Sequence, residues 1–190
     1  MKRYLLSILL SIIACQNNKG RTITMETEFG LIKLKLFSDN APVTVKNFLK
    51  YVHEKRYDDF HFYRSVNLKN QLNKKIKIEV IQGGLGLKNH PMRLEPIAHE
   101  STNITGLKHL NGSLSMARVE PGSASSEIFI CINDQPELDY GGKRNPDGQG
   151  FAVFGKVLEG LEIIKLIHNQ KSEDQMLKKP IFIKFMNKNL

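Results

Sequence analysis

Four side chains interrupt apolar segments of this sequence with groups that could contact a substrate: Arg64 in FYRSV, Gln82 in VIQGG, Met116 in SLSMA and Phe129 in EIFI. An arginine stays charged and offers several N–H donors in a planar fork, and a glutamine amide both donates and accepts hydrogen bonds. Taken singly, each residue has an ordinary explanation, as a surface cation, a strand-end cap or core packing. Taken together, they could place a charged donor and an amide beside an apolar pocket.

Gln82 stands between an apolar segment and two glycines. The apolar residues of 78–81 suit a largely buried strand. Gly83 and Gly84 supply backbone freedom, or the absence of a side chain, just beyond the strand. We therefore expect the Gln82 amide to have hydrogen-bonding partners at a point where the chain turns sharply or a ligand approaches closely.

The elements that must position these residues are mostly short strands. Alternating apolar and polar residues predict a β-hairpin over 22–36. Helical spacing predicts a helix within 39–55, with Asp39 or Asn40 as its cap and Pro42 in its first turn, and a second helix over 158–168. Further strands are predicted at 60–66, 76–82, 113–117, 127–132, 151–157 and 180–186. This pattern favours a mainly β fold, a closed antiparallel barrel capped by two α-helices, in which the long loops at 83–112 and 133–150 shape a site.

The N-terminus is typical of an export signal. MKRYLLSILLSIIAC opens with two basic residues, continues through eleven apolar or small residues, too few to cross a bilayer as a helix, and ends at Cys15. The segment before Cys15 resembles the bacterial lipobox, which predicts a signal peptide over 1–14, a lipid on Cys15 and a polar tether over 15–21. An ordinary cleaved signal and an uncleaved anchor are the alternatives. Gln16 lacks the acidic character associated with inner-membrane retention, which favours the outer membrane.

Composition limits the class of partner. The chain has 190 residues, 41% hydrophobic and 25% charged, which is typical of one globular domain. Its formal charge of +9 becomes +7 without Lys2 and Arg3, and export argues against nucleic acid as the partner. The Lys- and Asn-rich segment 68–77 is either a solvated loop or a surface attracted to an anionic membrane. Cys131 has no cysteine besides Cys15 with which to pair, and it is expected to be a small buried hydrophobe.

Ordered motifs run through the chain: TITMETEFGLIKLKLF, FYRSV, VIQGG, NGSLSMAR, SEIFICIND and LDYGGKRNPDGQGFAVFGKV. As a set they resemble the cyclophilins, the cyclophilin-type peptidyl-prolyl cis-trans isomerases. The resemblance implies a closed eight-stranded helix-capped barrel over 22–190, with Arg64 as the catalytic residue. The substrate-binding residues that it implies are Gln82, Met116, Ala117, Glu127, Phe129, Leu138 and Phe151.

The sequence departs from the family pattern at several positions near the implied groove. Glu79, Arg118, Glu127, Glu137 and Phe151 stand where better-known members have Phe, Asn, Gln, Trp and His. Phe151 can still form a wall of a proline pocket, whereas the missing Trp argues against strong binding of cyclosporin-type inhibitors. The residues added before VIQGG, the insertion YGGKRNPDGQ and the motif SEIFI resemble a bacterial branch of the family.

The implied reaction needs no nucleophile, metal or cofactor. Delocalisation of the amide nitrogen lone pair creates a barrier of about 18–20 kcal/mol, so an uncatalysed X–Pro bond isomerises over tens to hundreds of seconds. A guanidinium that donates to the proline nitrogen in the twisted transition state stabilises that state selectively. The expected partners are proline-containing unfolded or flexible polypeptides in the bacterial cell envelope or periplasm, the membrane is reached through Cys15, and the chain is expected to act as a monomer.

Two other function classes remain open at this point. The chain could be a binding module with a cyclophilin-like fold, because a carboxylate of Glu79 or Glu127 paired with Arg64 would withhold the guanidinium from substrate. It could also be a metal-dependent enzyme that uses His90, His99, Glu100 and His109, although their spacing matches no compact ligand motif.

Overall fold

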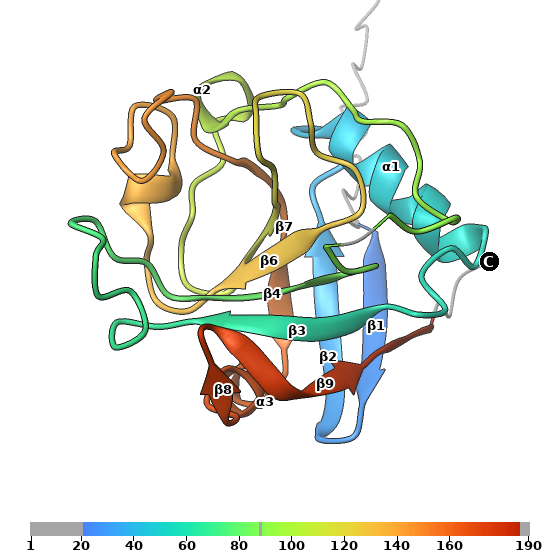
Figure 1. Cartoon of the computed structure of the whole chain (residues 1–190). Coiled ribbons are helices and arrows are strands. Elements are labelled where there is room, and N and C mark those ends of the chain that lie inside the picture. The colour runs from blue at the N-terminus through green and yellow to red at the C-terminus, as the bar shows by residue number, and fades with distance from the viewer. Residues whose placement is uncertain (1–20, 88, 187–190) are drawn as a thin grey trace, which may run out of the picture.

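The computed structural model describes residues 21–87 and 89–186. Within these residues, ten strands form one antiparallel sheet in the order β10-β1-β2-β7-β5-β6-β4-β3-β9-β8 (Figure 1). The strands are β1 (Thr22–Thr27), β2 (Gly30–Leu36), β3 (His61–Val66), β4 (Val80–Gly84), β5 (Ser113–Met116), β6 (Ile128–Cys131), β7 (Ala152–Glu159), β8 (Ser172–Glu173), β9 (Met176–Phe182) and β10 (Lys184–Met186). The helices are α1 (Pro42–His53), α2 (Thr102–Thr105) and α3 (Leu161–His168), with a 3-10 turn at Pro136–Leu138.

The strands curl around an apolar core. Figure 1 shows β3, β4 and β6 crossing in front of β1, β2 and β7. The main core cluster draws on both groups, with Ile32 and Leu34 from β2 and Ile81, Ile128 and Ile130 from the strands in front. Burial of these side chains supplies the main driving force for the fold.

The expected closed eight-stranded barrel with two helices is wrong in strand number, closure and helix count. The C-terminal segment divides at Ile183, because β9 pairs with β3 whereas β10 pairs with β1. The hydrogen-bonded order therefore has two ends, and only the chain itself, through Ile183, joins one side of the sheet to the other. The short strand β8 and the four-residue helix α2 also escaped prediction, since elements of this length carry almost no periodic signal.

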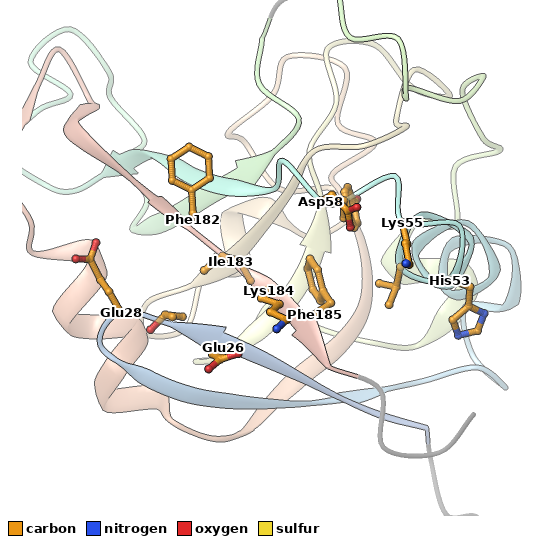
Figure 2. A pocket seen from close by; sticks show the side chains of 12 residues that line it. Glu26, Glu28, His53, Lys55, Asp58, Phe182, Ile183, Lys184 and Phe185 are labelled. Atoms are coloured by element: carbon orange, nitrogen blue, oxygen red, sulfur yellow. The ribbon is translucent and has the colours of Figure 1, made fainter.

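A hollow lies beside this division of the C-terminal segment. Figure 2 shows Glu26 of β1, Glu28 in the turn after β1, His53 at the end of α1, and the segment 182–185 around it. None of the residues that line it belongs to the predicted site. The hollow therefore lies apart from the predicted site, between β1, the end of α1 with the segment after it, and the segment 182–185.

The helix α1 begins as the sequence predicts but is capped differently. Pro42 occupies the first turn, as expected, whereas the N-cap is Ala41 and makes no side-chain capping bond. The Glu100 carboxylate supplies the acceptors instead, since the backbone N–H groups of Val43 and Thr44 donate to it at 3.1 and 2.8 Å. The predicted cap by Asp39 or Asn40 is wrong because a distant carboxylate satisfies the exposed N–H groups and the positive end of the helix dipole.

Two predicted boundaries shift for local reasons. The strand expected from residue 76 begins only at Val80, because Ile78 bonds to the buried amide of Gln71 through both its N–H and its carbonyl, at 3.3 and 2.8 Å. The second helix begins at Leu161 after Gly160, whose φ of 88° breaks the preceding strand β7. Within the described residues, no helix combines the length and apolar character needed to cross a bilayer.

Candidate active site

The sheet register places three predicted site residues in one row. Arg64 on β3 pairs with Gln82 on β4, Gln82 pairs with Phe129 on β6, and Phe129 pairs with Ser115 on β5. Directly paired residues of neighbouring antiparallel strands project their side chains to the same face. Arg64, Gln82 and Phe129 therefore share the face of the sheet that lies opposite the main core.

An irregularity in β3 brings a fourth residue into this row. The pairing of β3 with β4 shifts between Phe62 and Arg64, so that Tyr63 is an extra residue opposite Gln82. A bulge of this kind re-aims side chains that strict alternation would send to opposite faces. The Gln82 Nε2 atom can thus donate to the Tyr63 hydroxyl at 2.8 Å, while Arg64 reaches the oxygen of the same amide.

The Arg64 guanidinium is fixed by two neutral amide oxygens. Its Nη1 donates to Gln82 Oε1 at 3.0 Å, and its Nε and Nη2 both donate to Gln175 Oε1, at 3.1 and 2.6 Å. Partial burial lowers the pKa of Arg64 from its usual value, but a guanidinium remains protonated at neutral pH. Within the described part of the chain, these bonds engage three of the five N–H donors of the guanidinium. Both partners are uncharged amides, so they do not compensate the positive charge of Arg64.

The hydrogen bonds continue from Gln82 to a carboxylate. The Tyr63 hydroxyl donates to Glu127 Oε2 at 2.6 Å, and the other oxygen of Glu127 accepts from the backbone of Leu85 at 3.1 Å and from Ser126 at 2.9 Å. Burial raises the pKa of Glu127, against the opposing effect of these hydrogen bonds, and burial also raises the pKa of Tyr63. Glu127 therefore lies at the end of a series of hydrogen bonds that runs from Arg64 through Gln82 and Tyr63, and its carboxylate does not contact the guanidinium directly.

An apolar cluster covers the same face of the sheet. We call it the outer cluster, and its members are Val66, Ile78, Val80, Phe129, Cys131 and Leu138, with Ala117 and Phe151 packed against them. The Phe129 and Phe151 rings meet edge to face with centroids 5.3 Å apart. The structure thus brings Ala117, Phe129, Leu138 and Phe151 together, and it shows Cys131 as a buried thiol whose pKa is raised by burial.

Met116 does not join this group. It pairs with Ile128, one position along from the Ser115–Phe129 pair, so its side chain projects to the opposite face. There it is 1% exposed and packs in the main core. The structure therefore does not place Met116 beside Phe129, and the substrate contact predicted for it stays a prediction, whereas Val80 does belong to the outer cluster.

His109, which the sequence offered as a candidate metal ligand, lies behind Phe129. Its ring stacks on Phe129 with centroids 5.8 Å apart and an interplanar angle of 13°. Its Nδ1 lies 2.8 Å from Asp139 Oδ1, and its Nε2 lies 3.0 Å from Ser115 Oγ. Burial lowers the pKa of His109, so the neutral ring donates through Nδ1 to the carboxylate and accepts from Ser115. The Phe129 ring therefore packs against a buried imidazole, and both ring nitrogens of that imidazole have hydrogen-bond partners.

Arg118 anchors the insertion that precedes Phe151. Its side chain is 1% exposed, it pairs with both oxygens of Asp147 at 2.8 and 2.9 Å, and it donates to the Gly150 carbonyl. The Arg118 guanidinium also lies 5.1 Å from the centroid of the Phe151 ring. The bidentate bonds lower the pKa of Asp147. Arg in place of the family's Asn thus serves to hold Phe151 and its loop.

The candidate metal ligands are dispersed. Glu100 caps α1, the backbone of Met92 donates to His90, and His99 contacts the Gln149 carbonyl at 3.1 Å. His109 is engaged by Asp139 and Ser115, as described above. In residues 21–87 and 89–186 there is no group of three or more His, Cys, Asp or Glu side chains that could hold a metal ion.

Two residues at this site were missed from the sequence. Tyr63 gave no signal because only the bulge turns its hydroxyl toward Gln82. Gln175 lies 111 residues from Arg64 in the chain, in the turn between β8 and β9. Neither could have been found by spacing, since each contact depends on strand pairing.

Comparison with known proteins identifies the class that this fold and site define. Residues 22–187 match the family model for cyclophilin type peptidyl-prolyl cis-trans isomerase/CLD. The chain is 37% identical over 149 residues to peptidyl-prolyl cis-trans isomerase B of Escherichia coli (strain K12), covering 76% of this chain and 82% of the relative. It is 35% identical over 154 residues to peptidyl-prolyl cis-trans isomerase cyp18 of Streptomyces antibioticus, covering 80% and 85%.

A solved structure agrees with this assignment at the level of the fold. The cyclophilin type peptidyl-prolyl cis-trans isomerase of Cryptosporidium parvum, crystallised in the presence of the dipeptide Ala-Pro, superposes with a TM-score of 0.66 at 24% identity. The match covers 90% of this chain and 100% of that one. The chain belongs to the cyclophilin-type peptidyl-prolyl cis-trans isomerase family, and it is an isomerase of that type, as its motifs predicted.

Proposed function

We propose that this isomerase accelerates X–Pro rotation in exported polypeptides and so assists their folding in the bacterial envelope, with Arg64 as the donor to the twisted proline nitrogen. As the amide twists, its nitrogen lone pair localises and becomes a better hydrogen-bond acceptor. A donor placed at that nitrogen therefore binds the transition state more tightly than either planar isomer. One such donor, well placed in a desolvated site, contributes about 3–4 kcal/mol by analogy with oxyanion-hole groups.

One observation carries this proposal: Arg64 is held by the neutral oxygens of Gln82 and Gln175 on the face of the sheet that bears the outer cluster. A carboxylate partner would compensate the charge, whereas an amide oxygen orients the fork and leaves the charge for the substrate. The proline ring would rest against the outer cluster, at Ala117, Phe129, Leu138 and Phe151. Gln82 would hold the substrate backbone as well as Arg64.

Glu127 enters this proposal in an indirect role. Its carboxylate is occupied by Tyr63, Leu85 and Ser126, and its link to Arg64 passes through two intervening side chains. We assign it to the support of Gln82 instead of to direct contact with substrate. Glu79, the other acid that could have neutralised Arg64, accepts a bond from Asn133 Nδ2 at 3.2 Å. These contacts remove the reason for preferring a binding module without catalysis.

The test is the isomerisation rate of the Arg64→Ala variant on a proline tetrapeptide, measured by exchange spectroscopy so that kcat and KM are separated. We expect kcat to fall by roughly 10²- to 10³-fold. Arg64→Lys should recover little, because a point charge does not reproduce the planar fork. Full activity of Arg64→Ala would show that the donor is another group.

Export and lipid attachment rest on the first 21 residues, of which only Arg21 lies in the described part of the chain. The proposed arrangement is a cleaved signal over 1–14, a lipid on Cys15 and a tether over 15–21, with the isomerase domain of 22–190 acting as a monomer at the outer membrane. Metabolic labelling with an alkyne fatty acid tests it. The wild-type chain should be labelled and recovered in the outer-membrane fraction, and Cys15→Ser should lose both the label and the membrane association.

A further inference from the structure

We propose that Gln175 is a positioning residue for catalysis, which fixes the Arg64 fork and ties it to the insertion between β3 and β4. This inference rests on the proposed role of Arg64. Gln175 lies in the turn between β8 and β9, and its side-chain oxygen accepts from both Nε and Nη2 of Arg64. Two bonds from one edge of the guanidinium restrict rotation of the fork as well as its position.

The orientation of the Gln175 amide is itself fixed. Its Nε2 donates to the Asn70 carbonyl at 2.9 Å, so its oxygen must face Arg64. Gln82 follows the same rule on the other side of the guanidinium, because its Nε2 donates to Tyr63 while its oxygen accepts from Arg64. Arg64 thus lies between two amide dipoles that cannot flip without losing a second hydrogen bond. Such fixed dipoles need no reorganisation during the reaction.

The backbone of the turn adds a third restraint. Asp174 and Gln175 have φ values of 46° and 71°, a tight two-residue turn with unfavourable left-handed backbone at residues other than glycine. The Ser65 N–H donates to the Gln175 carbonyl at 2.8 Å, so the turn is bonded to the residue that follows Arg64. Strain held at a turn of this kind is consistent with a functional constraint on where its side chain points.

The insertion supplies the other end of the link. Asn70 holds its own place through its side chain, which accepts from the backbone of Asn67 at 2.9 Å and donates to the Ser65 carbonyl at 2.8 Å. The buried Gln71 amide donates to the carbonyls of both Asn67 and Ile78 and so fastens the base of the insertion. The Asn70 carbonyl is therefore a fixed acceptor. The insertion, which the sequence left as either a solvated loop or a membrane-binding surface, gains a role in orienting the site.

The experiment measures kcat and KM for Gln175 variants of the full chain by exchange spectroscopy on a proline tetrapeptide. Gln175→Ala should lower kcat about tenfold, with KM within about twofold of wild type, because the donor is misplaced while the apolar pocket is intact. Gln175→Glu should lower kcat at least as much, since a carboxylate neutralises Arg64 and turns a second acceptor toward the Asn70 carbonyl. Gln170→Ala is the matched control and should match wild type, because the side chain of this glutamine in the same C-terminal segment donates to the Leu166 carbonyl at an exposed position.

A double-mutant cycle tests the link to the insertion. Asn70→Ala should lower kcat about threefold in the wild-type background and have almost no effect in Gln175→Ala, because both changes release the same restraint. Asn73→Ala, at an exposed position of the same insertion, is its control. The Arg64 Nε–H signal should exchange with solvent faster in both Gln175→Ala and Asn70→Ala.

The outcomes separate this inference from the function on which it rests. If Arg64→Ala is inactive while Gln175→Ala and Gln175→Glu keep wild-type kcat, the positioning role is overturned and the donor role of Arg64 stands. Additive effects of Gln175→Ala and Asn70→Ala would overturn the link to the insertion. Full activity of Arg64→Ala would overturn the proposed donor itself.

Discussion

Removal of the Glu127 carboxylate should destabilise the fold much more than removal of its charge. In Glu127→Ala, the Tyr63 hydroxyl, the Leu85 N–H and the Ser126 hydroxyl lose their acceptor, and Arg93 loses a carboxylate at 3.4 Å. A buried donor without a partner costs about 1–3 kcal/mol, and some of these groups can relax toward solvent. We therefore expect a loss of about 3 kcal/mol in the free energy of unfolding.

Glu127→Gln should behave differently, with a loss of about 1 kcal/mol or less. The raised pKa of Glu127 shows that the folded environment favours its neutral form relative to water, so a neutral isostere does not lose a stabilising charge. The sign of the pH dependence follows. An acid whose pKa is raised on folding contributes stability that is fully present below its unfolded pKa and is lost as the pH rises through its folded pKa. Wild type should gain stability relative to Glu127→Gln as the pH falls from 7 to 4.

Equilibrium unfolding in urea, followed at each pH, measures these differences. Glu120→Ala removes an exposed glutamate from the loop that leads to β6 and is the matched control, expected to lie within about 0.5 kcal/mol of wild type. The reasoning is refuted if Glu127→Ala lies within about 1 kcal/mol of wild type. It is equally refuted if Glu127→Gln is as unstable as Glu127→Ala.

Two further predictions concern the support of the site. Burial lowers the pKa of His109, so the unfolded chain binds this proton more readily, and wild type should lose stability as the pH falls below about 6.5, the unfolded value. Burial alone would raise the pKa of Asp139, but the bonds from the side chain and backbone of His109 outweigh it and lower that pKa, which adds a second loss below about pH 4. In urea titrations His109→Asn should abolish the first loss and weaken the second, because it removes the imidazole that helps to lower the pKa of Asp139 and keeps the backbone N–H donor. Gly83→Ala should cost about 2 kcal/mol or more in the same assay, because a Cβ there would lie 2.6 Å from the His61 carbonyl oxygen. A stable Gly83→Ala protein would show that β4 can move away from β3 at this point.

The placement of Gln82 depends on both local sequence and distant strand pairing. The apolar residues before it and the glycines after it predicted a partnered amide at the end of a buried strand. The amide has its partners, but the strand does not end there, because β4 continues through both glycines. At Gly83 the absence of a side chain is what matters, because a Cβ there would lie 2.6 Å from the His61 carbonyl oxygen of β3, and the φ of Gly83 is outside the left-handed region that favours glycine. The partners of the Gln82 amide are Arg64 and Tyr63, and they depend on the bulge in β3, which the local amino-acid sequence does not predict.

The orientation of the Met116 side chain could not be predicted from the sequence. All four residues of β5 are buried, because the strand is covered on both faces, so alternation of polarity cannot reveal which face each side chain takes. The pairing of Met116 with Ile128 decides the question and sends it into the main core. The resemblance of motifs pointed to the segment that pairs with β6, but only the pairing shows which face of the strand Met116 takes.

The sequence by itself determined the family, most of the strands, both long helices, and the presence of Arg64, Gln82 and Phe129 in neighbouring strands, because these follow from periodicity and from an ordered set of motifs. Tertiary structure alone decided the contacts between distant segments. Glu100 caps α1 from more than fifty residues away, and Gln175 reaches Arg64 across the pairing of β9 with β3. Short segments record which side chains are apolar, whereas a hydrogen bond between remote residues exists only after strand register and turn geometry have placed its donor and its acceptor together.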